Sequence, residues 1–182
     1  MGFLENLNLM LNVKDSGAVR AHLNDQYNYI IENIPELKGM YTLKENPEYH
    51  TGTTWEHVVR VTCELPPQLR LVGIFHDIGK PETAKPSTKG DWYTFHKHDK
   101  VGADLIENEI GPRLGMSELL IRCLSTTTLL HMRAQQCPVG GPTNKMIRRF
   151  QREPIVSRSI VKILAPIDSP NLPESWEKLF EL

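Results

Sequence analysis

The sequence predicts an all-α domain with at most a small β-hairpin near residues 88–96. Apolar residues recur at helical spacing through most of the chain, with capping residues before these segments and proline or glycine after them. The 182 residues are 40% hydrophobic and 24% charged, which is typical of one ordinary globular domain. We therefore expect a single domain over residues 1–182, with a helical lead-in over 1–50, a core over 50–170 and a tail over 171–182.

The first part of the chain is predicted as helices separated by one long loop. Helical spacing indicates helices over 3–13 and 16–34, the second ended by the proline that follows it. Glycine and proline mark residues 38–52 as a loop. Thr53, with Glu56 three residues later, forms a capping box, so we expect the next helix to begin there.

The middle of the chain combines one buried helix with the predicted hairpin. Pro67 suits a first helical turn, and the apolar residues after it predict a helix over 68–78. Residues 80–97 are rich in turn-forming residues but contain an aromatic stretch. A hairpin turning at Lys89 and Gly90 is therefore the one β element that the sequence predicts.

The last part of the chain returns to helical spacing. We expect helices over 98–110, 117–134, 143–152 and 154–166. Gly111 and Pro112 are predicted to close the first of these, and Pro166 to kink or end the last. Trp176 and Phe180 in the tail are expected to dock back onto the domain.

The charge balance excludes some classes of function. Lys and Arg number 21 against 22 Asp and Glu, so a protein that coats nucleic acid is not indicated. A local basic excess over 145–162 fits a solvated helix face or, less often, an RNA-binding surface. No apolar run approaches the length of a membrane span, and three widely spaced cysteines indicate a reducing compartment. We expect a cytoplasmic protein with no membrane or disulfide partner, and the pattern indicates no particular oligomeric state.

The pair His76 and Asp77 ends the predicted buried helix. A buried carboxylate is costly unless it is neutralised, and imidazole with carboxylate suits Mn, Fe, Co, Ni or Zn. Lys80 follows after a glycine and could turn toward an anionic substrate. Further candidate ligands lie on or beside other helices: His57, His98, His131 and Asp168. Six N and O ligands from converging helices suit two ions better than one.

Five segments carry a family resemblance: residues 54–61, 75–84, 95–103, 130–133 and 163–168. Over residues 50–170 the chain resembles the HD-domain metal-dependent phosphohydrolases. It most resembles the HD domain at the C-terminal end of bacterial tRNA nucleotidyltransferases, the CCA-adding enzymes. The phrase His-Asp-Ile-Gly-Lys-Pro-x-Thr, beginning at His76, is the most specific part of the match.

The resemblance implies a helical fold and hydrolysis of phosphomonoesters or phosphodiesters, including 2′,3′-cyclic phosphates. It implies this ligand set: His57, His76, Asp77 and Asp168 for the core metal, with His98 and His131 for a second ion. Asp77 would bridge the two ions, and Lys80 would lie near the scissile phosphate. The sequence His-Lys-His-Asp makes His96 compete with His98, and the residues that follow favour His98 by the family's register.

We therefore expect a phosphohydrolase in which a metal-activated water cleaves phosphoester bonds of nucleotides or RNA ends, above all phosphodiesters. One or two divalent ions are implied: Mn, Ni, Co, Fe or Zn, with Mg also fitting. Asp77 and Lys80 are the candidate catalytic residues, and Lys80, Arg133 and His96 the candidate substrate contacts. The alternatives are a nucleoside 5′-(tri)phosphate hydrolase or phosphomonoesterase, and a non-catalytic metal- or nucleotide-binding sensor or structural module. His22 and His50 are interpreted as ordinary surface or core residues.

Overall fold

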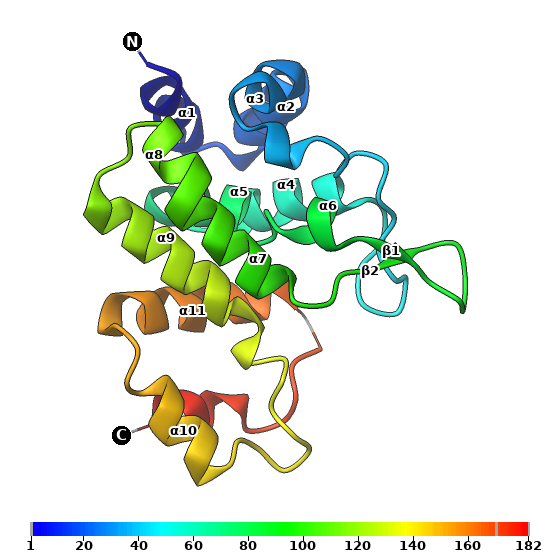
Figure 1. The fold of residues 1–182 in the computed structure, drawn as a ribbon, viewed down its shortest axis with the longest axis vertical. Helices are drawn as coiled ribbons and strands as arrows, with labels where there is room; N and C mark the ends of the chain where they lie inside the picture. The colour runs from blue at the N-terminus through cyan, green and yellow to red at the C-terminus, as the bar shows by residue number, and fades with distance from the viewer. Residues whose placement is uncertain (1, 170, 182) are drawn as a thin grey trace.

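The structure, a computed structural model, describes residues 2–169 and 171–181 and confirms the all-α prediction (Figure 1). Helices of the lead-in lie at one end of the molecule, the helices that carry the His and Asp pattern lie in the middle, and α10 lies at the other end with the C-terminus. The small hairpin projects from one side of the middle layer.

The lead-in consists of α1 (Phe3–Leu11), α2 (Ser16–Asp25), α3 (Tyr27–Asn33) and the short η1 (Pro35–Leu37). One continuous helix over 16–34 is therefore wrong, because the chain turns at Gln26. The turn lets Tyr27, at the start of α3, pack its ring against Trp55 and Tyr41, at 4.7 and 5.0 Å between ring centroids. Tertiary contacts of an aromatic residue thus override an unbroken helical pattern.

The middle layer begins with α4 (Thr54–Glu64), and the predicted capping box is confirmed at Thr53 and Glu56. After η2 (Pro67–Leu69) comes α5 (Arg70–Phe75), which ends three residues earlier than the predicted helix over 68–78. The chain turns through His76–Gly79 and enters α6 (Lys80–Thr83). This turn gives the His–Asp pair its place at the end of a fully buried helix.

The predicted hairpin is confirmed, with β1 (Lys85–Pro86) antiparallel to β2 (Tyr93–Thr94) and Lys85 opposite Thr94. The prediction placed the hairpin near residues 88–96, and its first strand begins slightly earlier, at Lys85. An isolated bridge between Lys44 and Thr53 also ties the loop over 38–52 to the start of α4. This bridge holds the loop against the middle layer.

The helix that begins at His98 does not close at Gly111 and Pro112, so that prediction is wrong. Instead α7 (His98–Leu105) continues through the π-helical turn η3 (Ile106–Ile110) into α8 (Gly111–Arg113). The wide π turn accommodates the proline, whose ring and missing N–H disfavour an ordinary α-helical turn. Glycine is needed beside it, because a Cβ at Gly111 would lie 2.5 Å from Ile121 Cγ1.

The remaining helices are α9 (Glu118–Leu130), η4 (His131–Arg133), α10 (Asn144–Phe150), α11 (Ile155–Asp168) and η5 (Trp176–Phe180). Pro166 does not end α11, which reaches Asp168. Pro166 lacks the N–H that would donate to the carbonyl oxygen of Lys162, so the helix continues for its last two residues with one hydrogen bond fewer. The tail docks as predicted, because the ring of Phe180 packs on Phe150 at 5.0 Å between centroids.

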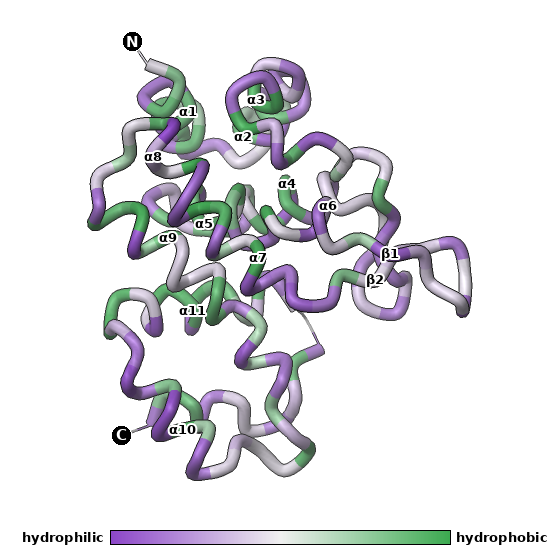
Figure 2. Tube along the Cα trace, viewed as in Figure 1, coloured by the Kyte–Doolittle hydropathy of each residue, from purple (hydrophilic) through white to green (hydrophobic). Residues whose placement is uncertain are grey.

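Two hydrophobic clusters form the interior of the described chain. The larger joins lead-in residues such as Leu7 and Val19 to residues of α4, α5 and α11. The smaller contains Leu130, Cys137, Phe150, Val161 and Leu179. Figure 2 shows the corresponding apolar stretches along α1, α5, α9 and α11, with more hydrophilic residues along the hairpin and α10. Within the described residues, no helix is long and apolar enough to cross a membrane, and the three cysteines are free.

Candidate metal centre

Six buried side chains from different parts of the fold meet in the middle layer. Each lies at or near the end of its element or inside α4, as follows: His57 on α4, His76 and Asp77 directly after α5, His98 at the start of α7, His131 at the start of η4 and Asp168 at the end of α11. Their ligand atoms form two groups, within each of which all atoms lie within 4.8 Å of one another. Helix ends of this kind place side chains from distant segments around one point.

Asp77 joins the two groups through its two carboxylate oxygens. Its Oδ2 faces the first group, at 3.2 Å from His57 Nε2 and 3.1 Å from His76 Nε2. Its Oδ1 faces the second group, at 3.2 Å from His98 Nε2 and 3.5 Å from His131 Nε2. Asp168 completes the first group, with Oδ1 at 3.0 Å from His57 Nε2. The carboxylate of Asp77 therefore lies between two pairs of imidazole rings.

The backbone orients three of these imidazoles. The Nδ1 atoms of His76, His98 and His131 lie 2.8, 2.7 and 2.5 Å from the carbonyl oxygens of Gly73, Phe95 and Thr128. A carbonyl oxygen can only accept, so each Nδ1 donates its proton, and the neutral ring presents a lone pair at Nε2. This arrangement is the one that metal-binding histidines use to fix ring orientation.

The second group, formed by Asp77, His98 and His131, has the donor atoms that a cation requires. His98 Nε2 and His131 Nε2 lie 3.1 Å apart, and both rings have already used their Nδ1 protons. When both rings are neutral, two buried lone pairs face each other with no hydrogen between them. Asp77 Oδ1 lies beside this pair, at 3.2 Å from His98 Nε2 and 3.5 Å from His131 Nε2, and adds negative charge to the group. A divalent cation would satisfy these atoms, and N and O donors suit Mn, Fe, Co, Ni or Zn.

His57 differs from the other three histidines. Arg60 Nη2 lies 3.3 Å from His57 Nδ1, and a guanidinium can only donate. The neutral ring therefore carries its proton on Nε2, toward the carboxylates. Binding a cation through Nε2 requires that proton to leave and Arg60 to release the ring. Arg60 also donates to the carbonyl oxygens of Ile167 and Asp168, at 2.8 and 3.2 Å, and so anchors the end of α11 beside α4.

The two carboxylates bring negative charge into a fully buried site. Burial favours the neutral imidazole of His76, but the charge of Asp77 and a hydrogen bond to Asp168 outweigh it and raise the pKa of His76 to about 10. Burial likewise opposes ionisation of Asp77, yet the charges of His76 and Lys80 hold its pKa well below the usual range. Without a cation, a proton on His76 thus supplies part of the charge that balances the carboxylates.

Lys80 is held by two carboxylates. Its Nζ lies 2.7 Å from Glu45 Oε1 and 2.8 Å from Asp77 Oδ2, and Lys80, Glu45 and Asp77 are all buried. Burial opposes the ammonium form, but the charges of Asp77 and Glu45 raise the pKa of Lys80 well above its usual value. Lys80 is therefore a permanent cation beside the shared carboxylate, 5.2 Å from the ring centre of Phe95.

A cavity of about 450 Å³, here called the central cavity, opens onto the centre. Asp77, Lys80, His98 and Asp168 lie in its wall, whereas His57, His76 and His131 lie behind it. The rest of the wall comes from residues 45, 46, 49 and 50, residues 92–96, residues 132, 135 and 136, and residues 169, 171 and 173. Most of these wall residues lie in loops that show no helical or strand periodicity.

The structure separates the remaining sequence candidates. His98 is buried with its Nε2 toward Asp77, while His96 is exposed in the wall of the central cavity. Arg133 is not in that wall: it lines a neighbouring cavity, and its Nη1 donates to Gln136 Oε1 at 2.8 Å. His22 is exposed on α2, as expected of a surface residue.

Sequence analysis missed several residues that touch the centre. Glu45 binds Lys80, and Gln135 donates to Asp168 Oδ2 at 2.9 Å. His50, interpreted from the sequence as an ordinary residue, packs against His57 with ring centroids 4.2 Å apart and the ring planes tilted by 48°. Burial and the neighbouring His57 lower the pKa of His50 to about 4, so this ring is neutral at neutral pH. Glu45 and His50 lie in a loop without periodicity, which leaves no local signal for their contacts.

The chain matches one known protein family. The model of the HD domain matches residues 48–163, a span that contains every residue of the centre except Asp168, which lies just beyond its end. No curated protein matches the chain. The family consists in general of metal-dependent hydrolases, and the buried His and Asp cluster fits a divalent-metal site typical of it. Because the match covers more than half of the 182 residues, we conclude that the chain belongs to the HD domain family.

Proposed function

We propose that this protein is a metal-dependent phosphohydrolase that cleaves phosphodiester bonds of nucleotides or RNA ends, with 2′,3′-cyclic phosphates as the first candidates. The observation that carries the proposal is the two-sided environment of Asp77. Its Oδ2 faces His57 and His76, and its Oδ1 faces His98 and His131. We infer that these residues and Asp168 would hold one or two divalent ions.

When bound, such ions supply Lewis acidity, which polarises phosphoryl oxygens and makes water a nucleophile at neutral pH. The chain itself supplies binding and orientation. Lys80 Nζ lies in the wall of the central cavity beside Asp77, where an ammonium can meet a phosphoryl oxygen and stabilise growing negative charge. Glu45 also binds that ammonium, so the Lys80 side chain need not reorganise when substrate enters. His96 lies in the same wall as a candidate substrate contact.

The charge of the central cavity supports a phosphodiester over a triphosphate. Among the described residues in its wall, Lys80 is the only Lys or Arg, and two carboxylates already neutralise it. A triphosphate carries several negative charges and would enter with few cations to meet it. A diester carries one charge, which the bound ions and Lys80 can balance. The resemblance to the HD domain of the CCA-adding enzymes favours the same class of substrate.

The test is hydrolysis of bis-p-nitrophenyl phosphate by the purified protein, with Mn²⁺, Ni²⁺, Co²⁺, Mg²⁺ or Zn²⁺ added in turn. We expect metal-dependent release of p-nitrophenol that is lost in Asp77→Ala and retained in Asp25→Ala, which removes an exposed carboxylate at the end of α2. A screen of 2′,3′-cyclic nucleotides then identifies the natural ester.

Three outcomes would reject parts of the proposal. Release by protein containing Asp77→Ala at the wild-type rate would reject the assignment of the centre. Cleavage of nucleoside triphosphates or monoesters without diester cleavage would reject the substrate class. Tight metal binding without turnover of any of these esters would instead identify a binding module.

A further inference from the structure

A second cavity of about 230 Å³, here called the cationic cavity, lies between α7, the end of α9 and α10. Its wall contains the cations Lys100, Arg133 and Arg149, and one carboxylate, that of Glu153. The remainder of the wall is largely apolar, with Phe150 among its buried members. Cations above an apolar floor bind an anionic group more strongly than in open solvent, because the surroundings have a lower dielectric constant.

The three cations are available to a ligand. In the part of the chain that the structure describes, some surface cations pair with carboxylates, as Lys44 does with Asp91 and Arg113 with Glu36. Lys100, Arg133 and Arg149 form no such ion pair within the same described residues, and Arg133 donates only to the neutral Gln136. Guanidinium groups present paired donors that match the oxygens of a phosphate. The cationic cavity therefore has the chemistry of a phosphate site.

This cavity adjoins the central cavity. Gln136 lies in the walls of both the central and the cationic cavities. The two elements that bring the second group of imidazoles each place a cation two residues later: His98 is followed by Lys100 on α7, and His131 by Arg133 on η4. A ligand that occupies both cavities would therefore pass Gln136.

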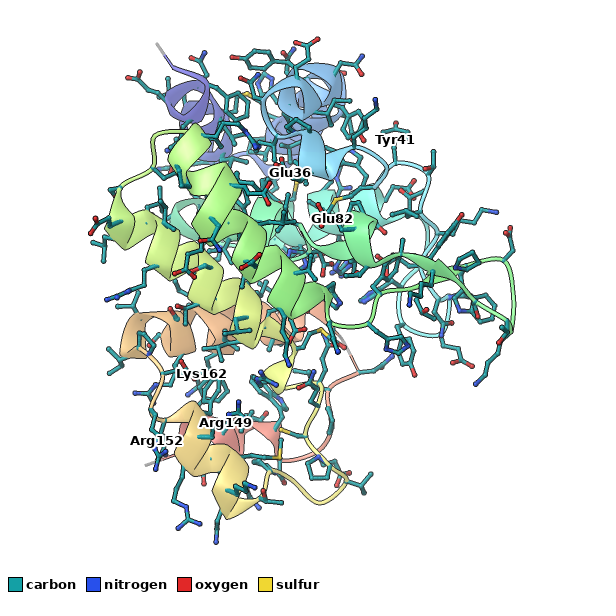
Figure 3. The ribbon with its side chains drawn as sticks, in the orientation of Figure 1. Glu36, Tyr41, Glu82, Arg149, Arg152 and Lys162 are labelled. Atoms are coloured by element: carbon teal, nitrogen blue, oxygen red, sulfur yellow. The ribbon has the colours of Figure 1, made fainter. Side chains whose placement is uncertain are left out.

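Positive charge continues beyond the cationic cavity. Residues 131–162 contain only one acidic residue, Glu153, and these cations: Arg133, Lys145, Arg148, Arg149, Arg152, Arg158 and Lys162. Figure 3 shows the labelled Arg149 and Arg152 toward one end of the molecule, Lys162 nearer its middle, and Glu36 and Glu82 in the other half. The docked tail adds Glu174, Glu177 and Glu181 and the cation Lys178 to this end, so cations still outnumber carboxylates there in a chain whose net charge is −1. Such asymmetry fits a ligand with a series of phosphates.

We propose that the cationic cavity binds a phosphate of a single-stranded nucleic acid whose neighbouring phosphoester lies at the metal centre. The position of the reacting ester rests on the proposed function, whereas the binding of the strand does not. The central cavity holds one neutralised lysine for the reacting group, and the cationic cavity supplies the charge for the adjacent phosphate. The exposed Arg148 on α10 and the exposed Arg152, two residues after the helix, continue the path. The proposed substrate is therefore the end of a nucleic-acid strand rather than a free mononucleotide.

The binding test uses fluorescence anisotropy of a labelled, short single-stranded oligoribonucleotide in EDTA, so that turnover does not enter. The variants are Arg149→Gln and Arg133→Gln, and the control is Arg20→Gln, which removes an exposed cation on α2. We expect each cavity variant to bind roughly tenfold more weakly and to lower the salt dependence by about one phosphate contact. We expect Arg20→Gln to bind like the wild type, and circular dichroism melting confirms that each variant is folded.

Equal affinities of the wild type, Arg149→Gln and Arg133→Gln would overturn the proposal. So would an equal loss in Arg20→Gln, since that would indicate diffuse attraction to the whole surface. Binding of inorganic pyrophosphate without binding of the oligonucleotide would also overturn it, because the cavity would then serve a small anion. A second measurement compares kcat/KM for a 2′,3′-cyclic-phosphate-ended oligonucleotide with that for the matching mononucleotide. We expect this ratio to fall about tenfold in Arg149→Gln; an unchanged ratio contradicts the placement of the adjacent phosphate.

Discussion

Lys80 connects the metal centre to a carboxylate from a distant loop. Its ammonium lies between Asp77, a candidate ligand, and Glu45, which the isolated bridge between Lys44 and Thr53 holds near α4. Glu45 offsets the positive charge that would otherwise compete with a cation for Asp77 Oδ2. The net charge around Asp77 thus depends on Glu45, which is not one of the candidate metal ligands.

Replacing Glu45 by Gln is expected to weaken metal binding. Gln keeps the size of the side chain but removes its charge, so Lys80 interacts more strongly with Asp77 Oδ2. Substitutions beside metal ligands typically lower metal affinity by 10- to 100-fold, and we expect about tenfold for Mn²⁺ in isothermal titration calorimetry. The control is Glu48→Gln, an exposed carboxylate in the same loop. Unchanged affinity in Glu45→Gln would show that Glu45 does not tune the centre.

At the scale of the elements, close approach of backbones sets the position of His98. Gly79, at the turn before α6, lies against the start of α7: a Cβ on Gly79 would be 2.3 Å from the carbonyl oxygen of His98 and 2.5 Å from the amide nitrogen of Gly102. Both contacts involve backbone atoms, which cannot rotate aside as a side chain can. The short distance between α6 and α7 therefore requires glycine at this position.

The substitution Gly79→Ala is expected to lower the free energy of unfolding by about 1–3 kcal/mol, as overpacking does in a tight interior. Because relief of the clash moves α7, it also displaces His98 and weakens metal binding. Urea unfolding measures the first effect and calorimetric titration with Mn²⁺ the second. The control is Gly2→Ala, where an added Cβ meets no atom within 4 Å. A fully stable Gly79→Ala protein with normal metal affinity would refute the requirement for glycine.

The start of α4 depends on a local device. Thr53 accepts a hydrogen bond from the backbone N–H of Glu56, whose carboxylate binds the N–H of Thr53 at 2.7 Å in return. Thr53→Ala removes one half of this capping box and is expected to destabilise the fold by about 1 kcal/mol in urea unfolding. Thr51→Ala, an exposed threonine in the preceding loop, is the control. Equal stability of the two variants would contradict a role for the cap in the folded protein.

At the scale of the whole molecule, we expect metal binding at this centre to be coupled to folding. The six residues of the centre come from positions between 57 and 168, so they can converge only when the described helices are packed. A ligand that binds only the native state stabilises it, by about 2.7 kcal/mol at one hundred times its dissociation constant. The thermal stability of the protein should therefore report how much of the centre is occupied by metal.

We expect Mn²⁺ at such a concentration to raise the melting temperature of the wild type, and excess EDTA to reverse the rise. Asp77→Ala is expected to show no such rise, because it removes the carboxylate that faces both groups of imidazoles. His22→Ala, an exposed histidine on α2, is expected to respond like the wild type. A rise of equal size in Asp77→Ala would place the stabilising ion elsewhere.

The sequence by itself determined the class of the fold and most of its elements. Helical spacing, the cap at Thr53 and the turn residues around Gly90 are local signals, and local backbone preferences follow from them. Errors arose where packing overrides such signals, as at Gln26 and at Pro112. The sequence also selected the six His and Asp residues that the structure brings together, and their role as metal ligands stays a prediction.

Only the tertiary structure decided how those residues meet. Which oxygen of Asp77 faces which imidazoles, and which ring takes a hydrogen bond from Arg60, depends on how α4, α7 and α11 pack. The contacts of Glu45 and His50 likewise come from a loop without periodicity that folds over the centre. Local patterns specify backbone conformation within a segment, whereas distances between segments far apart in the chain are set by the packing of the whole core.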